Sequence, residues 1–105
     1  MYKKRQPRAF RLLLATGLLM LSACASNPPV QEMSDARQAI QAAITAGAEE
    51  HAALALKDAR QFLADAEANL HRKAYNGAKN DAREAKRWAE VAINTAVKAA
   101  GTEQH

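Results

Sequence analysis

The most regular pattern in the chain is a row of apolar positions, spaced by three and four residues, in its C-terminal third. The row consists of Tyr75, Ala78, Ala82, Ala85, Ala89, Ala92, Ala96 and Ala99. Because an α-helix completes a turn every 3.6 residues, these steps place the whole row on one helix face. The pattern predicts a long amphipathic helix whose buried stripe is almost entirely alanine.

Two earlier stretches show the same helical spacing. The first has its apolar side at Met33, Ala36, Ile40, Ala43 and Ile44, and the second at Leu56, Ala59, Phe62, Leu63, Ala66 and Leu70. Gly47 can adopt the left-handed conformation that ends a helix, and Asn76-Gly77 marks a second break. We therefore expect residues 48–51 and 73–77 to be the connections between three helices.

Short connections make neighbouring helices antiparallel, so the sequence predicts an all-α fold, a small antiparallel bundle of three helices over residues 32–100. The same spacing also suits a helical hairpin, or a longer rod, with a coiled-coil-like alanine seam. Alanine buries little area, so larger side chains beside the seam are expected to complete the core. These are Leu54, Phe62, Trp88, Val91, Ile93 and Val97. Residues 101–105 are expected to fray as a tail.

The N-terminal pattern is of another kind. A basic leader, residues 1–11, is followed by ten mostly apolar residues, 12–21, and by the small residues Ser22 and Ala23. This is the layout of a secretory signal, and the apolar run is about half of the ~20 residues that span a bilayer. We expect residues 1–23 to be a cleaved signal peptide.

The net charge of +4 belongs to this first segment. Residues 1–23 carry five basic side chains and no acidic one, whereas the other 82 residues carry ten basic and eleven acidic side chains. The part that remains after cleavage is therefore almost neutral, and no nucleic-acid partner is expected for it.

The four residues Leu21-Ser22-Ala23-Cys24 resemble the lipobox of bacterial lipoproteins. The resemblance implies that Cys24, the only cysteine, becomes the first residue and carries diacylglycerol on its sulfur and an acyl group on its amine. Residues 24–31 would then be a lipidated N-terminus and flexible linker. Because Ala25 rather than Asp follows the cysteine, the resemblance also implies the outer membrane, on its periplasmic side.

The rest of the chain offers little catalytic chemistry. Ser26 and Ser34 are the only serines after the lipobox, and the three histidines do not have the spacing of zinc ligands. We expect no enzymatic activity, no metal site and no small-molecule substrate. The only expected group is the covalent lipid on Cys24.

Basic residues are concentrated between residues 72 and 87, where six of them stand against two acids. They are Arg72, Lys73, Lys79, Arg83, Lys86 and Arg87. Such a cluster predicts an anion-binding face for lipopolysaccharide or phospholipid head groups. The alternative is a solvated face that is attracted, within the bundle, to the acidic stretch 32–50.

From Cys24 to residue 100 the order of features resembles a family of alanine-rich bacterial lipoproteins known as domain of unknown function 4398. The matching features are Cys24 with a proline-containing spacer, Ala36-Arg37-Gln38-Ala39-Ile40, the Ala48-Glu49-Glu50 corner, and Tyr75 with Ala78. Two departures are visible: Lys73-Ala74 stands where the family often has Gly-Asp, and Ala52-Ala53 where it often has a proline. The resemblance implies a location and an architecture, but no activity.

These observations together predict an outer-membrane-anchored periplasmic lipoprotein that acts as a non-enzymatic structural or interaction module of the cell envelope. The membrane is expected to be its partner through the lipid, together with an envelope protein or a second copy of the chain. The alternative function is a binding module for anionic envelope components, through the basic residues of 72–87.

Overall fold

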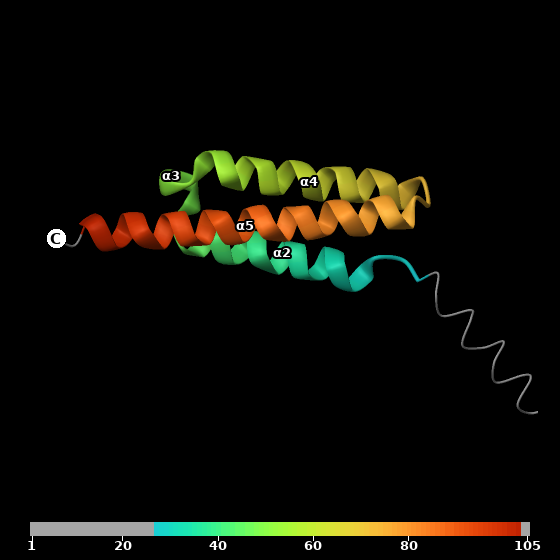
Figure 1. Ribbon diagram of the computed structural model, residues 1–105, viewed down its shortest axis with the longest axis horizontal. Helices are drawn as coiled ribbons and strands as arrows, with labels where there is room; N and C mark the ends of the chain where they lie inside the picture. The colour runs from blue at the N-terminus through green and yellow to red at the C-terminus, as the bar shows by residue number, and fades with distance from the viewer. Residues whose placement is uncertain (1–26, 104–105) are drawn as a thin grey trace, which may run out of the picture.

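The computed structural model describes residues 27–103, and the regular structure in this range is entirely helical. Its elements are α2 (Val30–Thr45), α3 (Ala48–His51), α4 (Ala53–His71) and α5 (Tyr75–Glu103). In Figure 1, α5 lies between α2 and α4, and α4 runs antiparallel to both. The predicted all-α bundle with three main helices is confirmed. The expected signal peptide and Cys24 lie outside the described residues.

The alanine row of α5 forms the centre of the core. Every alanine from Ala78 to Ala96 in this row is fully buried. Their partners are Met33, Ala36, Ile40 and Ala43 on α2, and Leu56, Ala59 and Ala66 on α4. Methyl groups let the helix backbones approach closely, so the predicted seam is confirmed. The residues of the described hydrophobic core all lie between residues 33 and 96, so the bundle needs no residue before this range to form that core.

Three of the larger side chains expected in the core are not there. Leu54 is 80 % exposed, Val97 is 58 % exposed and Val91 is also exposed. Each lies one or two residues from a buried position, and one residue turns a helix by about 100°. They therefore point away from the seam, and that part of the prediction is wrong. Phe62, Trp88 and Ile93, in contrast, pack half-buried against the core.

The first corner contains the predicted left-handed glycine. Gly47 has φ 91°, and its N–H donates to the carbonyl of Ile44 at 3.0 Å. The connection after it, however, is not a loop but the one-turn helix α3. Alanine and glutamate are good helix formers, and Ala48 is buried, so this segment gains both local and core stabilisation.

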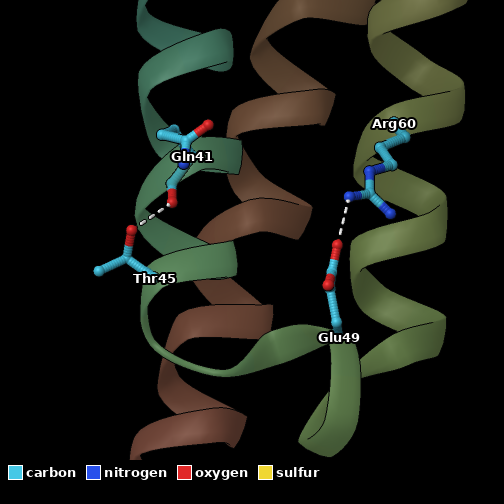
Figure 2. A network of polar contacts seen from close by, with 4 residues as sticks. All are labelled: Gln41, Thr45, Glu49 and Arg60. Atoms are coloured by element: carbon cyan, nitrogen blue, oxygen red, sulfur yellow. Dashed lines mark hydrogen bonds and ion pairs between the residues drawn. The ribbon is translucent and has the colours of Figure 1, made fainter.

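An ion pair fixes α3 to the next helix. Arg60 of α4 lies 3.0 Å from the carboxylate of Glu49, and Figure 2 shows this pair beside the end of α2. At that end, the hydroxyl of Thr45 donates to the carbonyl of Gln41 at 3.0 Å. The corner is therefore held by the Glu49–Arg60 pair on its outer side and by Ala48 on its inner side.

The second corner lies earlier than expected. The chain turns at residues 72–74, where Lys73 has a left-handed backbone (φ 61°), whereas the break was expected at Asn76-Gly77. The N–H of Lys73 donates to the carbonyl of Leu70 and that of Ala74 to the carbonyl of Asn69. These two bonds close the end of α4. Gly77 instead lies in the first turn of α5, so the predicted break there is wrong.

The outer bounds of the helical part also differ from the expected 32–100. α2 begins at Val30, directly after Pro29, whose carbonyl accepts a hydrogen bond from Met33. Proline suits a helix start because its φ angle is already near the helical value. At the other end α5 continues to Glu103, so residues 101–103 of the expected frayed tail are helical.

Candidate functional site

Within residues 27–103 no group of three or more His, Cys, Asp and Glu side chains is arranged to hold a metal ion. The helices in this range are all too short or too polar to cross a bilayer. All the fully buried side chains described are apolar. The remaining chemistry of the described surface is charge, and the six expected basic residues are its main concentration.

The structure divides these six residues into three places. Arg72 and Lys73 occupy the turn between α4 and α5. Lys79, Arg83 and Lys86 follow one another on α5 at steps of four and three residues, which is the spacing of one helix face. Arg87 is the sixth, and its contacts separate it from the others.

The guanidinium of Arg87 is held by a neighbouring carboxylate. Its Nε and Nη2 donate to one carboxylate oxygen of Glu84, at 3.2 and 2.6 Å, and its Cζ lies 5.2 Å from the centre of the Trp88 ring. The hydrogen bond and charge of Glu84 raise the pKa of Arg87 above its ordinary value. Arg87 therefore has a partner within its own helix and is the least available of the six for an external anion.

Arg72 belongs to a short polar chain that ties the turn to α5. Its guanidinium donates to Oδ1 of Asn69 at 3.0 Å, and Nδ2 of Asn69 donates to Asp81 at 2.7 Å. The amide of Asn69 lies close to Gly77, where an added Cβ would be only 3.2 Å from Nδ2. This arrangement was not predicted, and the only trace of it in the sequence is the glycine.

Ion pairs leave most of the basic cluster free. Within residues 27–103, carboxylates pair with Arg37, Arg60 and Arg87. In the same range Arg72, Lys73, Lys79, Arg83 and Lys86 have no carboxylate within ion-pair distance. Acidic residues of the stretch 32–50 pair elsewhere: Glu49 with Arg60, and Glu50 with His51. The two charged stretches thus form no described ion pair with each other.

A groove brings the start of the described chain beside the basic residues. It is lined by Asn27, Pro28, Val30, Gln31, Glu32 and Lys79. In Figure 1 the beginning of α2 and the turn between α4 and α5 lie at the same end of the bundle. Arg72, Lys73 and Lys79 are therefore gathered at the end from which the chain leads back toward Cys24.

A second groove lies between the start of α4 and the middle of α5. Leu54, Ala55 and Asp58 line it from α4, and Trp88 and Thr95 from α5. Its floor includes half-buried Trp88, which also packs against the core. The groove is apolar at Leu54 and Trp88, and the basic residues of the first groove are absent from its lining.

Comparison with protein families places most of the described chain in one of them. A family model described as "Domain of unknown function (DUF4398)" matches residues 31–104. The match covers α2 to α5 except for Val30, the first residue of α2. Comparisons with curated proteins and with solved structures found no match.

Proposed function

The chain belongs to the DUF4398 family, and from that premise we propose that it is a lipid-anchored lipoprotein of the outer membrane, facing the periplasm. Its bundle would serve as a non-enzymatic structural or interaction module of the cell envelope. The observation that carries the proposal is the lipobox Leu21–Cys24 at the end of a short apolar run. Helix α2 begins at Val30, so a lipid on Cys24 would hold the folded bundle close to the bilayer.

The strength of membrane attachment depends on the number of acyl chains on Cys24. Each buried CH₂ contributes about 0.8 kcal/mol, and a single chain holds a protein only marginally. A diacylglycerol and an amide-linked acyl chain on Cys24 would together give stable attachment. Tethering then raises the effective concentration of the bundle near envelope partners, so weak contacts suffice.

Metabolic palmitate labelling of the Cys24→Ala variant tests the anchor. We expect the label to be lost from this variant and kept in the matched Ser26→Ala variant, because only the thiol can accept the lipid. Label retained on Cys24→Ala would refute the proposal. Membrane fractionation of Ala25→Asp tests the sorting: movement to the inner membrane supports the outer-membrane assignment, and unchanged fractionation contradicts it.

The alternative function is binding of anionic envelope components through the basic residues of 72–87. It is favoured by the five side chains there that lack a carboxylate partner within the described range. Lipopolysaccharide and anionic phospholipids carry the phosphate groups that such residues bind. Salt-sensitive binding of the protein to lipopolysaccharide would support this function, and binding no stronger than that of a Lys79→Glu, Arg83→Glu variant would contradict it.

A protein partner or a second copy of the chain is the remaining proposal. Crosslinking in intact envelopes followed by capture of the protein would identify a partner. Analytical ultracentrifugation over a concentration series would separate a monomer from a self-associating species. A monomer that captures no envelope protein would exclude the interaction role.

A further inference from the structure

Three of the basic residues without a described ion pair lie at one end of the bundle. We call Arg72, Lys73 and Lys79 the basic end: Lys79 lines a groove with the start of α2, and Arg72 and Lys73 lie in the turn between α4 and α5 at the same end of the bundle. Arg72 and Lys73 are exposed, and within residues 27–103 none of the three has an ion-pair partner. Glu32 is the one acidic residue in the lining of the groove that Lys79 shares with the start of α2.

The opposite end has another charge pattern. Glu49 and Glu50 lie in α3, at the far end of the bundle from the turn between α4 and α5. Glu49 is paired with Arg60, and the carboxylate of Glu50, which lies 3.8 Å from His51, is 85 % exposed. The long axis of the bundle therefore runs from the basic end to the end at α3, where the carboxylate of Glu50 is exposed.

The lipid anchor proposed above would bring the basic end to the membrane. Asn27, the first described residue, comes three positions after Cys24, and three residue steps span at most about 11 Å. The Debye length is about 8 Å at physiological ionic strength, so the tether is short enough for charges beside Asn27 to come within one Debye length of the bilayer surface. Each Lys or Arg close to an anionic surface strengthens attachment roughly five-fold.

We propose that the basic end docks on anionic phospholipid head groups of the membrane that holds the anchor, so that the bundle stands with its long axis away from the bilayer. The inference rests on the proposed lipid anchor and adds an orientation and a lipid preference to it. In this orientation the groove beside Leu54 and the far corner, α3, face the aqueous space and remain open to a partner. The basic residues thus orient the bundle for a partner at its other end.

The competing geometry is a bundle that lies flat on Lys79, Arg83 and Lys86. Trp88, the only tryptophan, distinguishes the two. At ~1.5 Å per residue it lies about 20 Å along α5 from Tyr75, so it is far from the head groups in the upright bundle. In the flat bundle only the width of α5 separates it from them, so it is closer.

Energy transfer from Trp88 to dansyl-labelled head groups tests the proposal. Residues 24–105 contain the self-sufficient core, and the thiol of Cys24, the only one, can be coupled chemically to a maleimide phospholipid in vesicles. We expect energy transfer in phosphatidylglycerol-containing vesicles to be lower than in phosphatidylcholine vesicles. On a neutral surface the tethered bundle can tilt and bring Trp88 toward the head groups, whereas docking through the basic end holds it upright. The difference should disappear in high salt.

Charge-reversed variants assign the effect to the basic end. In Arg72→Glu, Lys73→Glu the difference between the two vesicle types should be lost, whereas the matched Lys57→Glu, Lys98→Glu variant should keep it. Lys73→Glu, Lys79→Glu serves as a second test that leaves the Arg72–Asn69 hydrogen bond intact, in case the first variant folds poorly. Higher transfer in anionic vesicles would show the flat geometry, and equal transfer would show no docking; either result overturns the proposal.

Chemical coupling separates this result from the fate of the anchor in the cell. If Cys24→Ala kept its palmitate label in the cell, the proposed anchor would be refuted, but the vesicle measurement would be unaffected because its lipid is attached chemically. A failure in vesicles with labelling intact would remove only the docking.

Discussion

Lys73 has the left-handed backbone conformation that glycine usually adopts at helix ends. It closes the end of α4 with φ 61°, and the N–H groups of Lys73 and Ala74 satisfy two helix carbonyls. A side chain in the left-handed region costs about 1–2 kcal/mol relative to the right-handed one. Lys73 is the non-glycine residue with positive φ among residues 27–103, so a side chain stands here where the described backbone is most demanding.

Replacing Lys73 by glycine should therefore stabilise the protein. We expect Lys73→Gly to raise the free energy of unfolding by about 1 kcal/mol, measured by urea denaturation. Lys73→Ala is the control, because it removes the charge but keeps a Cβ in the left-handed conformation, and it should leave stability nearly unchanged. Equal effects of the two substitutions would show that charge, and not backbone strain, determines the result.

Gly77 makes room for the side-chain amide of Asn69, a role that could not be inferred from the neighbouring sequence. The absence of a Cβ lets the Asn69 amide approach α5 and donate to Asp81 at 2.7 Å. Alanine at this position would gain up to about 1 kcal/mol of helix propensity but would press on the amide. Two opposing effects of similar size should nearly cancel in the wild-type background.

A double-mutant cycle separates these two effects. We expect Gly77→Ala to stabilise the Asn69→Ala background more than the wild type, with a coupling of about 0.5–1.5 kcal/mol, the usual contribution of one hydrogen bond. Urea denaturation of the four proteins gives the coupling. Additive effects would mean that the Asn69 amide adjusts to the methyl group without losing its bond.

These two residues show why the second corner could not be placed from the sequence. A glycine usually marks the left-handed position at a helix end, so Asn76-Gly77 indicated the break. The actual left-handed residue is a lysine, and the glycine meets a requirement of tertiary packing instead. The first corner was predictable because there the conformational role and the glycine coincide at Gly47.

At the scale of elements, the alanine seam of α5 is the feature that the sequence predicted best. Its period is that of the helix, and all its members from Ala78 to Ala96 are fully buried. Spacing alone could not predict which flanking side chains complete the core, because that depends on where α2 and α4 lie around α5. Leu54 and Val97 therefore remain exposed, whereas Trp88 packs on the core.

The seam should not tolerate larger side chains. Ala85 lies in the core cluster that Met33 and Ala66 share, so Ala85→Leu forces the helices apart and should lower the free energy of unfolding by about 1–3 kcal/mol or more. Ala100→Leu, on the exposed end of the same helix, should change it by less than about 0.5 kcal/mol. Thermal and urea unfolding of both variants make the comparison. Similar small losses in the two would contradict close packing at Ala85.

The candidate site was predicted only as a run of charges. The sequence locates the six basic residues, but ion pairing and turn geometry decide how each can act. Glu84 engages Arg87, whereas Lys73 lies in the turn between α4 and α5, at the same end of the bundle as the start of α2. Such differences depend on contacts between helices, which a local count of charges does not contain.

At the scale of the whole molecule, α5 is the helix on which the others pack. It contacts both α2 and α4 and extends beyond α3 at the far end of the bundle (Figure 1). The last fully buried residue in the described part of α5 is Ala96, and an added Cβ at Gly101 would meet nothing within 4 Å. The final turns of α5 are thus helical without being covered by α2, α3 or α4.

Truncation of α5 should reveal where its structural role ends. A chain ending at Lys98 keeps every fully buried residue and should lose less than about 1 kcal/mol of the free energy of unfolding. A chain ending at Glu90 loses Ala92 and Ala96, which are fully buried, together with half-buried Ile93. Burial of such side chains is worth several kcal/mol, which is most of the stability expected of a domain this small.

Urea unfolding monitored by circular dichroism tests both truncations. The shorter chain should lose its cooperative transition, and the longer one should keep it with an unchanged slope, because the surface exposed on unfolding hardly changes. A marked loss of stability in the chain ending at Lys98 would contradict the view that the projecting turns stand free. If that loss also depended on protein concentration, the exposed turns of α5 would be packing on a second copy of the chain, because only stability that arises from association varies with concentration.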